Sequence, residues 1–216
     1  MHNLYLDIET IPSQEPWVRE YIEEKITPPG NIKKPESIEN WIYEKKPQAV
    51  EDAYRKTSLD GAMCHIVAIG WAVDGDKAKC VLTPGHKNEK VILRNFFDLC
   101  DDLSYPTVIG HNVNGFDMKI LRQRAMILGV KIPSCLPWAA KPWELNPYDT
   151  MVQWDAKNFI SMDKLAKAMG VKGKDGIDGS MVYDLWKDGE HDKLADYCKS
   201  DVDMVRQIHQ KMTGVR

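Results

Sequence analysis

The feature that most constrains the fold is a short alternating segment near the N-terminus, residues 3 to 9. Apolar side chains at positions 4, 6 and 8 alternate with Tyr5, Asp7 and Glu9. A period of two predicts a β-strand, because successive side chains of a strand point to opposite faces of the sheet. Pro12 ends the strand, since proline has no N–H group to donate to a neighbouring strand. The strand therefore has one apolar face and one face that carries two acids.

Further strands and helices are predicted after residue 62. Cys64 to Val73 is an apolar run typical of a buried strand, and Asp74-Gly75-Asp76 forms a turn into a returning strand, Lys77 to Leu82. Beyond this hairpin the pattern predicts a helix at 88 to 103, a strand at 106 to 110, a helix at 116 to 128, a proline-rich loop at 133 to 147, and helices at 161 to 170, at about 180 to 187 and at 190 to 213.

An antiparallel hairpin followed by a strand that is reached through a helix indicates an α/β fold. We expect a mixed sheet, antiparallel at its start and with later parallel strands, flanked by helices. We also expect one domain over residues 1–216. Residues 13 to 62 contain five prolines and charges of both signs, with helices predicted at 15 to 26 and 36 to 56. We interpret this segment as a surface insert that acts as a lid or a partner surface.

Composition excludes several classes of protein. With 43% hydrophobic and 28% charged residues, the chain is not a disordered one. Its net charge of −3 argues against a general coat for nucleic acid, although metals can offset carboxylates where a strand is held locally. Five scattered cysteines without a C-x-x-C motif favour a reducing, cytoplasmic compartment over a disulfide framework or a zinc site. No secretory signal and no apolar run of roughly 18 residues is present, so we expect no membrane association.

The acids Asp7 and Glu9 are unusual on an apolar strand. Their side chains share one face, where two like charges repel each other and lose hydration. One interpretation is that this face meets water. The alternative is that a divalent cation neutralises both charges.

The last predicted helix carries another acid at an apolar position. A stripe at spacings of three or four residues contains Leu194, Tyr197, Asp201, Val205, Ile208 and Met212. Tyr197 stands one turn before Asp201, so its hydroxyl group and the carboxylate can project into the same space. Asp201 either belongs to a site or lies at the edge of the core, bonded to tyrosine or water.

A third candidate segment runs from Gly110 to Asp117, between a predicted strand and a helix. Asp117 at the start of a helix is either a plain cap, which the helix dipole favours, or a site residue at the edge of the sheet. The side chains of His111 and Asn112 could likewise serve only to form hydrogen bonds with the backbone of the turn.

Four acids on three elements, Asp7, Glu9, Asp117 and Asp201, would then converge. Carboxylate oxygens suit Mg²⁺ or Mn²⁺ better than zinc. Two such ions, roughly 3.5–4 Å apart, support in-line displacement at phosphorus. Tyr197 would orient the attacking water through a hydrogen bond, because a phenol is a poor base at neutral pH.

These segments resemble the motifs of the DEDD 3′→5′ exonucleases, which have the ribonuclease H-like fold. D-x-E is present at Asp7 to Glu9, N-x-x-x-F-D at Asn112 to Asp117, and Y-x-x-x-D at Tyr197 to Asp201. The last motif is that of the tyrosine subtype; the histidine subtype is not matched, since residue 196 is aspartate. The chain is most similar to the exonuclease domain of family B DNA polymerases, and in length to stand-alone predicted exonucleases of that kind.

The resemblance implies a role for each matching residue. Asp7, Glu9 and Asp201 would hold the catalytic ion, Asp7 and Asp117 a second one, and Glu9 with Tyr197 the nucleophilic water. The backbone at Thr10 and Ile11 would face the 3′-terminal nucleotide, and Asn112 and Phe116 would shape the substrate cleft. The implied activity is metal-dependent removal of nucleotides from the 3′ end of single-stranded DNA.

Several alternatives stay open. The substrate could be RNA, the fold could serve as a non-catalytic nucleic-acid-binding or protein-binding module, or the enzyme could be an endonuclease. A replication or recombination protein is a possible partner. Asp149 is either a local cap or a support of the site, and the loop at 172 to 179 either binds phosphate or is simply solvated. Four tryptophans are candidates for stacking on unpaired bases: Trp17, Trp41, Trp138 and Trp143.

Overall fold

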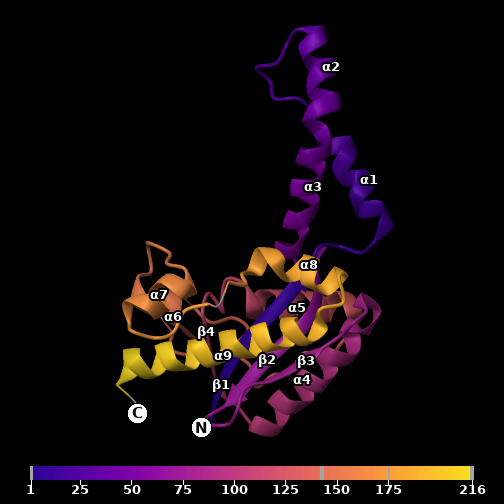
Figure 1. The fold of residues 1–216 in the computed structure, drawn as a ribbon. Helices are drawn as coiled ribbons and strands as arrows, with labels where there is room; N and C mark the ends of the chain where they lie inside the picture. Colours follow the sequence, from indigo (N-terminus) through magenta and orange to yellow (C-terminus); the bar gives the residue numbers. More distant parts are fainter. Residues whose placement is uncertain (1, 142–143, 175, 215–216) are drawn as a thin grey trace.

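The computed structural model describes residues 2–141, 144–174 and 176–214. These residues form a five-stranded sheet and the helices that pack around it. The strands lie in the order β3-β2-β1-β4-β5 (Figure 1). Their bounds are β1 Asn3–Ile11, β2 His65–Val73, β3 Lys79–Leu82, β4 Thr107–Gly110 and β5 Tyr148–Asp149. β1 to β3 pair in antiparallel fashion, whereas β4 is parallel to β1 and β5 is parallel to β4. The expected mixed sheet, with an antiparallel start and later parallel strands, is confirmed.

Helices cover both faces of the sheet. On the face of Leu4, Leu6 and Ile8 the core is completed by α4 (Glu89–Leu103) and α5 (Asp117–Leu128). On the opposite face the long helix α9 (His191–Thr213) crosses β1, β2 and β3. Most of both faces of β1 is therefore inside the molecule. On the face of the two acids Glu9 is buried, whereas Asp7 keeps partial access to water.

Buried polar contacts join the layer of α4 and α5 to β2. Glu89 accepts hydrogen bonds from Arg124 at 2.7 and 2.8 Å and from the backbone N–H of Ile66 at 3.0 Å. His65 lies 3.2 Å from the same carboxylate. This buried ion pair was not predicted, because it joins three elements that are distant in sequence.

Residues 16 to 56 form an arm of three helices that stands away from the sheet (Figure 1). Its helices are α1 (Pro16–Lys25), α2 (Pro35–Glu44) and α3 (Lys46–Lys56). The prediction of one helix over 36 to 56 is wrong, since the helix is interrupted at Lys45 and begins again just before Pro47. Pro47 cannot donate the backbone hydrogen bond that a continuous helix would need there. Close to the body, α1 and α3 pack through Val18, Ile22, Val50 and Tyr54.

The remaining helices are short. They are α6 (Thr150–Trp154), α7 (Met162–Ala168) and α8 (Val182–Lys187), and single turns of 3₁₀-helix precede α4 and α8 and follow α3. β5 and α6 were not predicted, because elements of two and five residues are too short to show a hydrophobic period. Among the described residues, no helix has both the length and the apolar character needed to cross a membrane.

Candidate active site

Strand β1 brings Asp7 and Glu9 to the face that lies beneath α9. Glu9 is only 7% exposed and Asp7 is half-buried. A carboxylate oxygen of each residue and the Sγ atom of Cys198, on α9, all lie within 4.8 Å of one another. Of the residues described by the structure, these three form the one such group that could hold a metal ion.

The stripe predicted on α9 faces the sheet. Leu194, Tyr197, Asp201, Val205 and Ile208 are all buried, and Met212 is partly buried. Asp201 is 2% exposed, so the interpretation that it lies at the edge of the core is wrong. Its Oδ1 atom is buried without a hydrogen-bond partner among the described residues. A buried, unpaired carboxylate oxygen costs free energy unless a cation or a donor satisfies it.

Asp117 begins α5 and reaches β1. Its Oδ1 atom accepts a hydrogen bond of 3.0 Å from the backbone N–H of Ile8. β4 pairs with β1 only at residues 3 to 5, so no strand partner is available for this N–H group. Asp117 thus completes the sheet edge beside Asp7. Its carboxylate makes no capping hydrogen bond to α5, whose N-cap is Phe116, although an acid in the first turn suits the helix dipole. Asp117 lies outside the compact group of Asp7, Glu9 and Cys198.

Asp149 holds the turn that leads to Asp117. Its two carboxylate oxygens accept hydrogen bonds from the backbone N–H groups of Asn112 (2.9 Å) and Asn114 (3.2 Å). The same carboxylate caps α6 through Met151 and Val152. Asn112 has a positive φ of 58°, a conformation that such bonds help to maintain. The local cap is therefore confirmed, and the same carboxylate also holds the turn that precedes Asp117.

The residues expected at the substrate cleft occupy different environments. A bulge after Glu9 shifts the register, so that Thr10 and Ile11 are both buried. The Thr10 hydroxyl donates to the carbonyl oxygen of Ser58 at 2.7 Å. Phe116 packs against the core, and Asn112 stays half-buried in the turn.

The candidate tryptophans are also placed differently. Trp17 is exposed on the arm, and Trp41 is half-buried on α2. Trp138 packs edge-on against Phe97 and donates a hydrogen bond to Pro133. Trp143 lies outside the described residues.

Lys174 inserts a positive charge among the acids. Its Nζ atom lies 2.5 Å from the Oδ2 atom of Asp201 and 2.5 Å from the hydroxyl of Tyr197. The surrounding loop is tied down where the Lys174 N–H donates to Asp163 at 2.9 Å. The sequence indicated a phosphate-binding or solvated loop here. It did not indicate this contact, because an aperiodic glycine-rich segment does not show where its side chains point.

The acids of the site lie close together and are largely shielded from water, and both effects raise their pKa values. Burial, followed by the charge of Asp201, raises the pKa of Asp7 to about 8. Burial and then the charge of Asp7 raise the pKa of Glu9 and of Asp117 well above the ordinary range. Burial also raises the pKa of Asp201, although Lys174 opposes this shift. The charges of Asp117 and Asp201 are thus felt at Asp7 or Glu9 even though both lie outside the compact group.

The donor set fits hard divalent cations. Carboxylate oxygens dominate, and the unpaired Oδ1 atom of Asp201 offers a further ligand. A hydrogen bond with Cys80, together with burial, keeps the pKa of Cys198 well above that of a free thiol. Cys198 is the single sulfur donor in this group, whereas zinc sites are usually rich in cysteine or histidine ligands.

Residues 56–205 match a protein family described as predicted 3′-5′ exonucleases related to the exonuclease domain of PolB. The chain belongs to this family. The match includes the motifs at 112 to 117 and 197 to 201, whereas Asp7, Glu9 and most of the arm precede it. The protein is thus an exonuclease of the PolB-related type, and exonucleases of this kind use divalent metal ions and act on nucleic acid.

A solved structure has the same fold. The family B DNA polymerase from the hyperthermophilic archaeon Pyrobaculum calidifontis matches 99% of this chain with a TM-score of 0.65 and 18% sequence identity. The PolB-related exonuclease spans 24% of that polymerase chain. At this identity the match establishes the fold, the ribonuclease H-like α/β architecture. Curated proteins include no sequence that matches the chain.

Proposed function

We propose that this exonuclease removes nucleotides from the 3′ end of single-stranded DNA with two divalent ions, Mg²⁺ or Mn²⁺, in the manner of the tyrosine subtype. Asp7, Glu9, Asp117 and Asp201 would hold the ions. The observation that carries the proposal is the buried, unpaired Oδ1 atom of Asp201, close to two acids whose pKa values are raised. Acids in such a setting ionise when a cation compensates them.

The reaction divides between the ions and the chain. Bound divalent ions would lower the pKa of the attacking water and stabilise the charge on the attacking and leaving oxygens. Tyr197 would orient that water with its hydroxyl proton, which it retains because burial and then Glu9 raise its pKa. Glu9 would accept a hydrogen bond from the same water. The water would then attack the last phosphodiester and release a nucleoside 5′-monophosphate.

Lys174 would take part through its charge. In the protein without ions, its ammonium group pairs with Asp201 and donates to Tyr197. Divalent ions at the carboxylates would repel the ammonium group of Lys174, and the phosphate of a bound substrate would attract it. We therefore propose that Lys174 turns from Asp201 to the non-bridging oxygens of the scissile phosphate.

Two hollows beside the turn of the second motif, residues 112 to 117, indicate where the single-stranded DNA would run. One, of about 250 Å³, is lined by Asn112, Asn114 and the exposed ring of Phe159. The other, of about 300 Å³, shares Asn114 and is lined by Lys119 and Arg122. Aromatic rings and cations in succession suit a single strand, whose bases are free to stack. Asn112 and Phe116 would shape this cleft, and the backbone of Thr10 and Ile11 would face the terminal nucleotide.

We also propose that residues 1–216 form one domain and that residues 13 to 62 are an insert in it. The strands on either side of that segment, β1 and β2, are antiparallel neighbours along their full lengths. A short hairpin loop would join such strands equally well. The arm therefore adds to the sheet without contributing a strand to it.

The test is a nuclease assay on a 5′-labelled single-stranded DNA oligonucleotide with Mg²⁺, Mn²⁺ or EDTA. The Asp7→Asn variant removes one charge at nearly constant volume, and Asp98→Asn, at an exposed position on α4, is the matched control. We expect a ladder that shortens from the 3′ end with wild type and Asp98→Asn. The ladder should disappear with EDTA and with Asp7→Asn.

Other outcomes would contradict particular parts of the proposal. Full activity of Asp7→Asn would refute the assignment of the acids. Degradation of a matched RNA strand alone would change the substrate, and cuts in a circular single strand would reveal an endonuclease. Tight binding without cleavage under any ion would indicate a binding module.

A further inference from the structure

A hollow of about 580 Å³ lies between the base of the arm and α8. The end of the arm contributes Lys56, and the 3₁₀ turn after it contributes Leu59. The turn before α8 contributes Met181, and Thr10 of β1 forms part of the wall. Thr10 directly follows Glu9, so this wall of the hollow lies one residue along β1 from the acid cluster. Its volume is in the range of sites that take ligands the size of a nucleotide.

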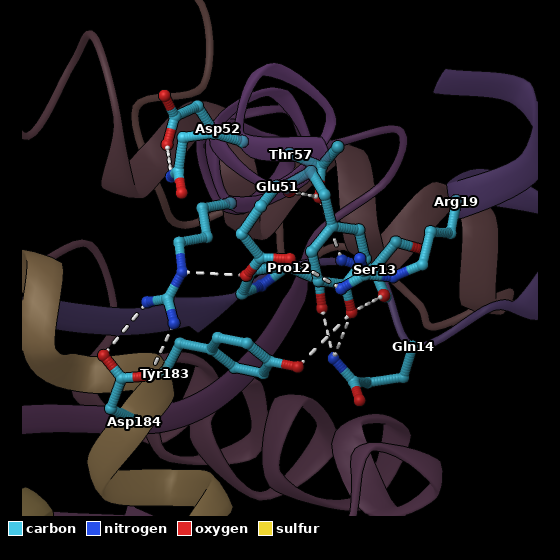
Figure 2. A network of polar contacts seen from close by, with 12 residues as sticks. Pro12, Ser13, Gln14, Arg19, Glu51, Asp52, Thr57, Tyr183 and Asp184 are labelled. Carbon is cyan, nitrogen blue, oxygen red and sulfur yellow. Dashed lines mark hydrogen bonds and ion pairs between the residues drawn. The ribbon is translucent and has the colours of Figure 1, made fainter. Parts of the chain in front are cut away.

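The walls of this hollow are tied together by polar contacts. The guanidinium group of Arg55 donates to Asp184 at 2.7 and 3.0 Å and to Glu51 at 3.0 Å, and so joins α3 to α8. The Tyr54 hydroxyl donates to the carbonyl oxygen of Ser13 at 2.8 Å. Figure 2 shows this network, with Asp184 and Tyr183 of α8 facing the polar side chains of the arm. The hollow is therefore formed before any ligand arrives, which reduces the entropy lost on binding.

The lining combines exposed apolar groups with a cation. Leu59 is 62% exposed and Met181 is 39% exposed, although both are large apolar side chains. Lys56 is exposed, and no polar partner of its ammonium group is found among the described residues. Apolar surface suits the flat face of a base, and a free ammonium suits a phosphate.

We propose that this hollow receives a nucleobase of the unpaired strand, within a nucleotide or two of the bond that is cleaved. Leu59 and Met181 would cover the faces of the base, and Lys56 would pair with the adjoining phosphate. The identity of the occupant rests on the proposed function, because the strand must pass Thr10 to place a phosphate at Glu9. Lys56 and Leu59, at the base of the arm and in the turn after it, thus belong to the substrate-binding surface, and they determine how firmly the end of the DNA strand is held.

A fluorescence titration tests, without catalysis, whether a nucleobase enters the hollow. A single strand that carries 2-aminopurine at its last or next-to-last position is titrated with protein in EDTA. We expect the fluorescence to change on binding to wild type. Binding should weaken by about 4- to 60-fold in Leu59→Ala, because one to three apolar carbon atoms lose their contact with the base. Leu145→Ala is the control, because Leu145 has the same residue type, is 63% exposed and does not line the hollow.

A second pair of variants tests the cation and guards against misfolding. Lys56→Met should weaken binding and reduce its dependence on salt, and Lys56→Arg should restore both. In the nuclease assay, Leu59→Ala should raise KM more than it lowers kcat, because Leu59 does not touch the reacting atoms. The melting temperatures of the Lys56 and Leu59 variants should match that of wild type, since both side chains are exposed.

The outcomes separate this inference from the proposed function. Unchanged binding in both Leu59→Ala and Met181→Ala, or no fluorescence change with wild type, would overturn the hollow as a base site. If wild type changes the fluorescence of the probe but cleaves no nucleic acid, and Leu59→Ala loses the fluorescence change, the base site stands and the proposed nuclease activity is refuted. An equal rise in KM in Leu145→Ala and in Leu59→Ala would show a non-specific effect and overturn the inference.

Discussion

Gly70 of β2 lies directly opposite Asp7 of β1, under the helix that carries Tyr197 and Asp201. A Cβ atom at Gly70 would lie 2.6 Å from the Sγ atom of Cys198 and 3.0 Å from a methyl group of Val202. The absence of a side chain therefore allows α9 to rest on the sheet at the position of the acids. The distance between Asp7 and the acid of α9 depends on this close approach.

Gly70→Ala should consequently affect both stability and activity. Crowding of a packed interior by one methyl group costs about 1–3 kcal/mol, and chemical denaturation measures it. Because α9 must move, nuclease activity should fall further than the loss of folded protein explains. Gly75→Ala is the control, since a Cβ atom there has no neighbour within 4 Å. A Gly70→Ala protein with wild-type stability would contradict the proposed contact.

The stability of the protein without metal should fall as the pH rises. An acid whose pKa is higher in the folded state stabilises the fold at low pH, and this contribution is lost as the pH rises through the folded pKa. Burial and then Asp201 raise the pKa of Asp7 from 3.8 to about 8, which places the loss between about pH 4 and about pH 8. Melting temperatures in EDTA across this range should decline, and Asp7→Asn should flatten the decline.

Added Mg²⁺ should reverse this trend, because a cation compensates the ionised acids. The rise in melting temperature on adding Mg²⁺ should be larger near pH 8 than near pH 5. An equal rise at both values, or a rise that persists in Asp7→Asn, would argue against metal binding at these acids.

The buried pair of Glu89 and Arg124 should respond to pH in the opposite sense. Burial by itself raises the pKa of Glu89, but the hydrogen bonds and charge of Arg124 outweigh it and hold the pKa below its usual range. The stability from this pair is present above the unfolded pKa and is lost as the pH falls through the folded one. Arg124→Met should cost about 3–5 kcal/mol near neutral pH, because Glu89 is left buried and unpaired.

Denaturant titrations measure that cost, and an exposed ion pair provides the comparison. Arg19 pairs with Glu51 on the surface of the arm, where Arg19→Met should cost less than about 1 kcal/mol. Similar losses in the two variants would contradict the difference in burial as the cause.

Asp149 should support activity without touching the substrate. Asp149→Ala removes the acceptor for the N–H groups of Asn112 and Asn114 and also the cap of α6. Loss of the cap costs about 1 kcal/mol, whereas activity should fall by more than ten-fold because Asp117 follows the same turn. Asp155→Ala, which removes a similar exposed turn contact at Lys157 and Asn158, should leave activity unchanged. Equal activity in the two variants would refute the support of the turn.

Local sequence patterns by themselves predicted several features of this protein. The alternation at residues 3 to 9 placed Asp7 and Glu9 on one face, and the spacing from Leu194 to Ile208 placed Tyr197 and Asp201 on one stripe. The order of strand, hairpin, helix and strand predicted the mixed sheet. Such features follow from periods of two and 3.6 residues, which depend only on neighbours along the chain.

Only the tertiary structure decided which distant groups meet. Lys174 beside Asp201, Asp149 beneath the turn at Asn112, and Arg124 against Glu89 join segments that no repeating pattern relates. The hollow at Leu59 depends in the same way on how the base of the arm packs against α8. Contacts of this kind arise from burial and close packing in three dimensions, where one missing Cβ atom at Gly70 sets how near a helix approaches a strand.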